Sequence, residues 1–393
     1  MAKKAVYITG MGGICAIGST IDEIRESLCN GESGIEPTKY LNTPVKFNTV
    51  SGEVALSNKE LAAYTGVESS LPRTTLLALK AAEEAISNAQ IDFNNLRVGI
   101  LLGTTVGGMD KTENLIKSDV SPEEYIPSHH CGFTTDYLAR HFKINHYSNT
   151  ISTACSSGAN ALMTGARLIK QGMLDVVVAG GSDALSAFTI NGFTSLMILD
   201  SEPCRPFSAE RKGLNLGEGA GFVILESEEL ANSRKANILA ELNGYANTND
   251  AFHQTASSPD GRGALEAMKQ ALEQANLSPK DINYINVHGT GTDNNDLTES
   301  IAIDNLFGSN TPDLSTTKGF TGHCLGAAGA IESLISILSI QNNEVYPNLR
   351  FGTPVIEGGK QPITKYKQKP VNHVLSNSFG FGGCDTSLIF SGV

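Results

Sequence analysis

Short apolar runs bounded by glycine recur along the chain and predict buried strands. They cover residues 5–9, 98–102, 175–179 and 221–227. Runs of this length are typical of strands that helices cover on both faces. Between them, apolar positions follow helical spacing and predict helices that begin near residue 20 or cover 74–89 and 155–170. We expect a Gly-rich turn after residue 9 and a loop from Ser182, within a mixed α/β fold.

One stretch of the chain is repeated later at a constant offset. Residues 78–86 align with residues 264–272, and the same offset places Gly103-Thr104 on Gly289-Thr290. Two Ala-rich helices can look alike by chance, but the shared Gly-Thr after the following strand argues against chance. The pattern therefore predicts two related halves, residues 1–235 and 236–393.

A second pairing brings possible chemistry into this repeat. It aligns residues 155–159 with residues 323–327, and a Gly-Ala pair falls in register at the head of a helix in both segments. If the halves arose by duplication, Cys155 and His323 occupy equivalent helix N-termini that face one pocket.

Composition and charge narrow the class of protein. A net charge of −12 over 393 residues argues against a nucleic-acid partner, whose usual footprint is a basic patch. Seven scattered cysteines without a CxxC pair indicate a reduced, cytoplasmic protein without a Cys-based metal site. We expect neither a signal peptide nor a membrane span, because no apolar run is long enough.

Cys155 lies in a run of small residues, and two glycine-flanked histidines follow it, His288 and His323. A lone cysteine in such a run is usually a small buried apolar residue. A thiol at a helix N-terminus near an imidazole has a lowered pKa, however, and the thiolate is a nucleophile. The two histidine motifs favour the nucleophile.

Five motifs in order resemble the elongating β-ketoacyl-acyl carrier protein synthases, condensing enzymes of the thiolase fold. They comprise residues 153–158; 288–292 with Asn295, Asp296 and Glu299; 318–323 with 326–332; 377–383; and 205–207 with 217–221. The resemblance covers nearly the whole chain. It implies two duplicated α/β halves in a layered αβαβα arrangement.

The resemblance also implies a reaction: decarboxylative condensation of malonyl-acyl carrier protein with an acyl group held on Cys155. His288 and His323 would stabilise the enolate, and Lys318 with Glu332 would form a supporting pair beside His323. A solvated ion pair is the other reading of Lys318 and Glu332. No metal or separate cofactor is expected, because the phosphopantetheine of the carrier protein delivers both substrates.

Further roles follow from the same resemblance. Cys155 and the turn at 380–383 would form the oxyanion hole, with Phe381 as a movable gate beside Gly382. The residues that would bind substrate are Thr290, Thr292, Val106 and Phe379. The two threonines are equally well explained as turn residues that bond only to their own backbone. Val106 is equally well explained as an ordinary core residue.

The expected partners are the acidic carrier protein and a second copy of the chain. Arg205, Arg211 and Lys212 are the best-clustered docking cations. In a homodimer, residues 128–133 would close the partner's acyl pocket, and Gly132 would leave room for the acyl chain.

Some residues depart from the usual pattern of the family. They include 211–214, which read Arg-Lys-Gly-Leu, and Cys384-Asp385, where Thr-Asn is usual. The departures leave chain-length preference open, so a specialised polyketide or polyene pathway is an alternative to fatty acid synthesis. Pairing with a non-catalytic chain-length subunit also stays open. An inactive subunit would lack the nucleophile, and a thiolase or an initiating synthase would pair its cysteine with a different set of residues.

Overall fold

Ten strands of the computed structural model join in one sheet. The structure describes residues 4–41, 50–115, 123, 126–356 and 359–393. In spatial order the strands are β10 (Asp313–Ser315), β9 (Tyr284–Asn286), β13 (His373–Gly380), β14 (Cys384–Ser391), β8 (Ala240–Asn249), β1 (Val6–Cys15), β7 (Gly219–Ser227), β6 (Val176–Asp183), β4 (Val98–Gly103) and β5 (Tyr147–Ile151).

The two ends of this sheet have the same internal order. Counted from each edge, β5-β4-β6-β7-β1 mirrors β10-β9-β13-β14-β8. The first two neighbour pairs are parallel and the next two antiparallel in both runs. A short pairing of β1 with β8, at Tyr7 and Ile8, joins the runs.

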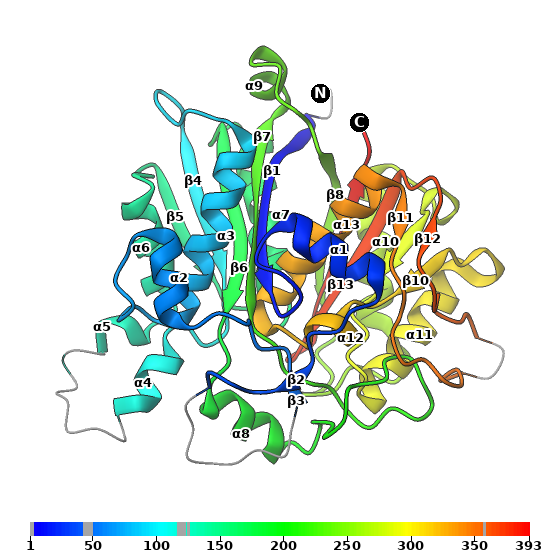
Figure 1. Ribbon diagram of the computed structural model, residues 1–393. Coiled ribbons are helices and arrows are strands. Elements are labelled where there is room, and N and C mark those ends of the chain that lie inside the picture. Colours follow the sequence, from blue (N-terminus) through cyan, green and yellow to red (C-terminus); the bar gives the residue numbers. More distant parts are fainter. Residues whose placement is uncertain (1–3, 42–49, 116–122, 124–125, 357–358) are drawn as a thin grey trace.

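Helices form three layers that alternate with the two runs of strands (Figure 1). Helices α7 (Ser157–Lys170) and α13 (Ala328–Asn342) lie in the middle, in contact with each other and with strands of both runs. Every residue from Ala328 to Ile340 is buried. Helix α3 (Arg73–Ala89) covers β1, β6 and β7, and helix α10 (Arg262–Ala275) covers β8, β13 and β14. The layers therefore run α, β, α, β, α.

Strand β1 extends further than the sequence predicts, because the expected turn after residue 9 is wrong. The glycines there belong to the strand, and a Cβ at Gly10 or Gly12 would clash with the carbonyl oxygen of Ala85 or Ala81 in α3. Glycine in this strand permits close approach of a helix rather than a turn. Strand β6 likewise runs through Ser182 to Asp183, where a loop was expected.

The predicted helices near residue 20 and over 74–89 and 155–170 are present as α1 (Ile21–Asn30), α3 and α7. Thr20 caps α1 by accepting the N–H of Glu23, and Gly31 ends it in the left-handed region. Helix α7 begins two residues later than predicted, so that Cys155 precedes it. The remaining helices are α2 (Asn58–Thr65), α4 (Met109–Leu115), α5 (Ile126–His129), α6 (Gly132–His141), α8 (Ala187–Ser195), α9 (Glu228–Ser233), α11 (Asp293–Phe307) and α12 (Lys318–Thr321). Two small sheets pair β2 (Glu36–Pro37) with β3 (Val50–Ser51) and β11 (Glu344–Val345) with β12 (Lys367–Gln368).

Candidate active site

Cys155 lies on a tight turn between β5 and α7. The preceding residue, Ala154, has φ +52°, a conformation that residues other than Gly, Asn and Asp rarely adopt. Cys155 itself is 6% exposed. A strained residue next to a candidate nucleophile is consistent with a functional site.

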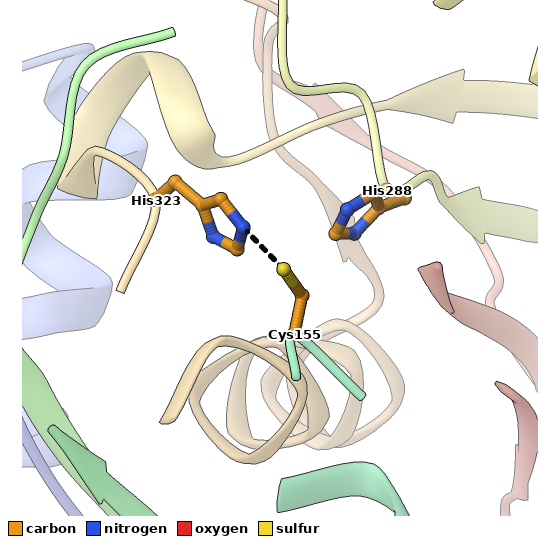
Figure 2. Close-up of side chains that lie close together, drawn as sticks. All are labelled: Cys155, His288 and His323. Atoms are coloured by element: carbon orange, nitrogen blue, oxygen red, sulfur yellow. Dashed lines mark hydrogen bonds between the residues drawn. The ribbon is translucent and has the colours of Figure 1, made fainter. Parts of the chain in front are cut away.

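The structure brings both predicted histidines to this thiol (Figure 2). Nε2 of His323 lies 3.0 Å from Sγ of Cys155. The rings of His288 and His323 are 5.4 Å apart and nearly perpendicular. His288 follows β9, and His323 lies between α12 and α13, the helix that corresponds to α7 in the second run. Cys155 and His323 thus face each other from the heads of the two central helices, as the internal pairing predicts.

Lys318 and Glu332 form a buried ion pair, whose charge acts on His323 but whose hydrogen bonds go to His288. Nζ of Lys318 lies 3.3 Å from Nδ1 of His288 and donates to the backbone oxygen of His288 at 2.5 Å. It also donates to Oε1 of Glu332. An ammonium beside Nδ1 makes that nitrogen the acceptor, so the proton of a neutral His288 sits on Nε2. The pair therefore fixes the tautomer of His288.

The pKa of the Cys155 thiol is raised, which corrects the expectation that it is lowered. Burial raises the pKa to about 11, and it outweighs the opposing effects of Lys318 and of the backbone N–H groups of Phe381 and Cys155. The resting thiol is therefore protonated. Its reactivity must come from proton transfer during attack rather than from a standing thiolate.

Both histidines are neutral at pH 7. Burial holds the pKa of His288 and of His323 well below the usual range, and the charge of Lys318 lowers both further. A neutral imidazole can accept a proton through one nitrogen or donate a hydrogen bond through the other.

Carboxylates support the loop that carries His288. Glu299 accepts the backbone N–H groups of His288 and Gly289 at 2.8 and 2.9 Å, and Asn377 donates to it at 3.1 Å. Burial raises the pKa of Glu299 to about 7. Asp296 accepts the N–H of Gly291 at 3.1 Å. These motif residues position the site without facing the thiol.

A cavity of about 900 Å³, its open mouth included, leads from solvent to Cys155, His288 and His323. Three predicted substrate-binding residues line it: Thr290, Thr292 and Phe379. The threonine hydroxyls lie 2.9 Å apart and bond to each other. They line the cavity and also bond within their own turn, and binding of the pantetheine arm by these hydroxyls stays a prediction.

A second, mainly apolar groove meets the cavity at Cys155. Val106, Phe188, Gly192 and Leu196 line it. Phe381 and Phe193 line both spaces and stack with ring centres 5.8 Å apart. The aromatic pair therefore separates the cavity from the groove. The role of Phe193 could not be predicted from the sequence, because Phe193 lies in no motif. Its contact with Phe381 forms only when the chain folds.

The turn at 380–383 lies directly against the nucleophile. A Cβ at Gly380 would lie 3.1 Å from the oxygen of Thr153 and 3.2 Å from the nitrogen of Cys155. Gly382 and Gly383 both have positive φ. The backbone N–H groups of Phe381 and Cys155 both act on the thiol, and they are the donors that the sequence assigns to an oxyanion hole.

The three predicted docking cations differ in their surroundings. The Arg211 side chain is 8% exposed, and its guanidinium donates to the backbone oxygens of Thr292, Ser208 and Asp293. Lys212 is exposed and lines the cavity mouth, and Arg205 is half-buried. Arg211 therefore holds the turn of Thr292 and is not a surface charge.

The segment 128–133 does not line the groove of its own chain. A Cβ at Gly132 would lie 3.1 Å from Nδ1 of His130 rather than in open space. The predicted effect of Gly132 on chain length concerns a partner's pocket and stays a prediction.

Cys155, His288 and His323 are also the one group of side chains, among the residues that the structure describes, whose arrangement could hold a metal ion. Their ligand atoms lie within 4.8 Å of one another. The ammonium of Lys318 beside His288 opposes a divalent cation there. The group is better suited to acyl chemistry than to metal binding.

Known proteins match this chain along nearly its whole length. The family model "Beta-ketoacyl synthase, N-terminal domain" matches residues 3–231, and the model of the C-terminal domain matches residues 239–352. A curated relative from Staphylococcus aureus (strain N315), named 3-oxoacyl-[acyl-carrier-protein] synthase 2, is 35% identical over 99% of this chain and 98% of its own. A protein of the same name from Synechocystis is 34% identical over the same shares.

Solved structures of ketosynthases are also similar to this chain over nearly its whole length. The ishigamide ketosynthase/chain length factor covers 100% of both chains with a TM-score of 0.93 and 29% identity. The Xenorhabdus doucetiae ketosynthase in complex with its chain length factor covers 99% of this chain and 98% of its own, with a TM-score of 0.84 and 31% identity. No helix within the described residues is both long and apolar enough to cross a membrane.

Proposed function

The chain belongs to the β-ketoacyl synthase family, and from that premise we propose that Cys155 carries the acyl group which the enzyme lengthens. The family and the thiolase-like fold predicted from the sequence are thereby confirmed. The reaction is a decarboxylative condensation of malonyl-acyl carrier protein with an acyl thioester, which adds two carbons. The single observation that carries the site assignment is the 3.0 Å contact between Sγ of Cys155 and Nε2 of His323, with His288 beside it.

The first half-reaction moves the acyl group. Nε2 of His323 takes the thiol proton as Sγ of Cys155 attacks the carbonyl of the incoming thioester. The backbone N–H groups of Cys155 and Phe381 hold the tetrahedral oxyanion. The sulfur of the pantetheine arm then leaves, takes the proton from His323 and departs as a thiol. Cys155 now carries the acyl group, and His323 is neutral again.

The second half-reaction forms the carbon–carbon bond. Malonyl thioester loses CO₂, and the Nε2–H groups of His288 and His323 hydrogen-bond the enolate oxygen. For this step His323 takes the tautomer with its proton on Nε2, which is open to it because no described residue bonds its Nδ1. The enolate carbon attacks the acyl carbonyl on Cys155, and the same backbone N–H pair holds the second oxyanion. The bond to Sγ breaks, and the thiolate of Cys155 takes up a proton. One oxyanion donor is typically worth roughly 3 kcal/mol.

The two spaces that meet at Cys155 fit the two parts of the substrate. The polar cavity with Thr290 and Thr292 takes the pantetheine arm, and the apolar groove with Val106 takes the acyl chain. Phe381 and Phe193 lie between them, so movement of Phe381 links the two. Phe379 packs 5.9 Å from His288 and orients its ring.

Mass spectrometry after exposure to acyl-carrier protein thioesters tests the proposal. We expect one acyl adduct on Cys155 and none in Cys155→Ala. An adduct elsewhere, or condensation by Cys155→Ala, would refute the assignment.

A second candidate function is a ketosynthase of a specialised polyketide or polyene pathway, paired with a non-catalytic chain-length subunit. The observation that favours it is the close structural likeness to two ketosynthases named together with chain length factors. The acyl group that Cys155 accepts best, measured across a series of saturated and polyene carrier thioesters, separates the two functions.

Three further parts complete the proposal. Two copies of the chain pair through β5 at the edge of the sheet, and each copy acts on acyl carrier protein.

Residues 1–235 and 236–393 are duplicated halves, and the identical strand order at both ends of the sheet supports this division. All seven cysteines are unpaired, which supports work in the reducing cytoplasm.

A further inference from the structure

The turn that carries Phe381 is held by the loop that follows β8. Nδ2 of Asn249 donates to the backbone oxygen of Gly382 at 2.7 Å, and the N–H of Gly382 donates to the oxygen of Gln254 at 2.8 Å. The same loop reaches the cavity wall at residues 255–257. The position of Phe381 therefore depends on how firmly this loop is docked.

Two buried carboxyl groups meet where the loop joins the turn. Asp250 is 7% exposed and Asp385, on β14, is 2% exposed. A Cβ on Gly263 of α10 would lie 2.9 Å from Cβ of Asp250 and would clash with Oδ2 of Asp385, so both side chains lie against the same glycine. Asp250 also shapes the loop, because its carboxylate accepts the N–H groups of Phe252 and Ser258 at 3.1 and 2.8 Å.

The charges around this pair are mostly negative. Burial, then Asp250, then Glu299 of α11 raise the pKa of Asp385 to about 8. Arg262 of α10 is the nearby cation, and its guanidinium donates to the backbone oxygen of Asp250 at 3.1 Å. Burial and the neighbouring negative charges oppose ionisation of Asp385, so its carboxyl keeps its proton at neutral pH.

We propose that Asp385 is a positioning residue: its protonated carboxyl keeps the loop at Asp250 docked on the turn at 380–383, and loss of the proton loosens the turn. The proposal rests on the proposed function, because Phe381 is assigned there as gate and oxyanion donor. An asparagine at this position would donate through its amide at every pH. The aspartate makes the docking of this turn depend on pH.

The chain has no tryptophan, which permits a test by fluorescence that needs no turnover. Phe252 is 50% exposed in the loop, so Phe252→Trp gives a single reporter there. We expect its emission to change with one protonation whose midpoint is close to pH 8. The transition should be absent when Asp385→Asn is added. Signals from His253, next to the reporter, occur in both proteins and cancel in the comparison.

The matched control is Cys384, whose Sγ lies 3.6 Å from Nδ2 of Asn249. Cys384→Ala should keep the transition. If Asp385→Asn fails to fold, Asp250→Asn serves instead and should move the midpoint to lower pH, because it removes the repelling charge. A midpoint that stays unchanged in the Asp variants, or that disappears with Cys384→Ala, would overturn the proposal.

Activity gives the functional readout. In the parent, kcat for condensation should fall on the alkaline side of the same midpoint, by up to about tenfold per pH unit as the protonated form is lost. Asp385→Asn should lack this fall, with KM for the carrier protein unchanged between pH values. Because the emission change requires no catalysis, its absence would refute the role of Asp385 and leave the proposed reaction intact.

Discussion

At the scale of single residues, the thiol and its two histidines are not equivalent in geometry. Of the two histidines, His323 is the one whose Nε2 hydrogen-bonds Sγ of Cys155, and the thiol, whose pKa is about 11, must give up its proton during attack. His323→Ala should therefore slow both acylation and malonyl decarboxylation. His288→Ala should depress decarboxylation by about a hundredfold or more while sparing acylation. Rapid-quench measurement of the acyl adduct, alongside CO₂ release from malonyl thioester, separates the steps. Equal loss of acylation in both variants would mean that His288 also serves the thiol.

Lys318 permits a second prediction at this scale. Lys318→Met removes the donor that fixes the tautomer of His288, so decarboxylation should fall. It also leaves Glu332 as a buried, unpaired carboxyl, which typically costs roughly 3–5 kcal/mol of stability. Adding Glu332→Gln should recover much of the unfolding temperature but not the activity. Recovery of both would show that the ion pair serves the fold alone.

At the scale of elements, the contact between β1 and α3 depends on glycine. A Cβ at Gly12 would clash with the backbone of α3, whereas a Cβ at Gly192 in α8 would meet nothing within 4 Å. Gly12→Ala should therefore destabilise the protein by about 1–3 kcal/mol. Gly192→Ala should be neutral or stabilising by up to about 1 kcal/mol. Urea unfolding of the two variants measures both effects, and equal stabilities would contradict the packing of α3 on β1.

The same contact shows what the sequence could predict and what it could not. Local patterns predicted β4, α3 and α7, because apolar spacing reflects which face is buried. The glycines of β1 suggested a turn, since the approach of α3 is a tertiary contact that no local pattern records. The motifs identified Cys155, His288 and His323. They could not reveal that Lys318 serves His288, nor that burial raises the pKa of the thiol, because both depend on residues distant in the chain. Phe193 was missed for the same reason.

At the scale of the whole molecule, one edge of the sheet is open in the single chain. Among the described strands, β5 pairs only with β4, and edge strands of this kind are usually covered. Near the apolar groove, Phe188 and Leu196 are 57% and 41% exposed. We therefore expect light scattering to give about twice the chain mass of 41.6 kDa. A fully active monomer would contradict this.

Docking of the acidic carrier protein on an acidic chain requires local positive charge at the cavity mouth, because only charges within about 8 Å act effectively at physiological salt. Lys212 is exposed at that mouth, whereas Arg211 is bound to the backbone of Thr292 and Asp293. Lys212→Glu should therefore raise KM for carrier-bound substrate several-fold while leaving a free pantetheine thioester almost unaffected, and high salt should mimic it. Arg211→Glu should instead impair both substrates, because it disturbs the turn that faces the pantetheine arm. Steady-state kinetics with the two substrates distinguishes the residues. If Lys212→Glu lowered the use of both substrates equally, its role would lie in the shape of the cavity and not in docking.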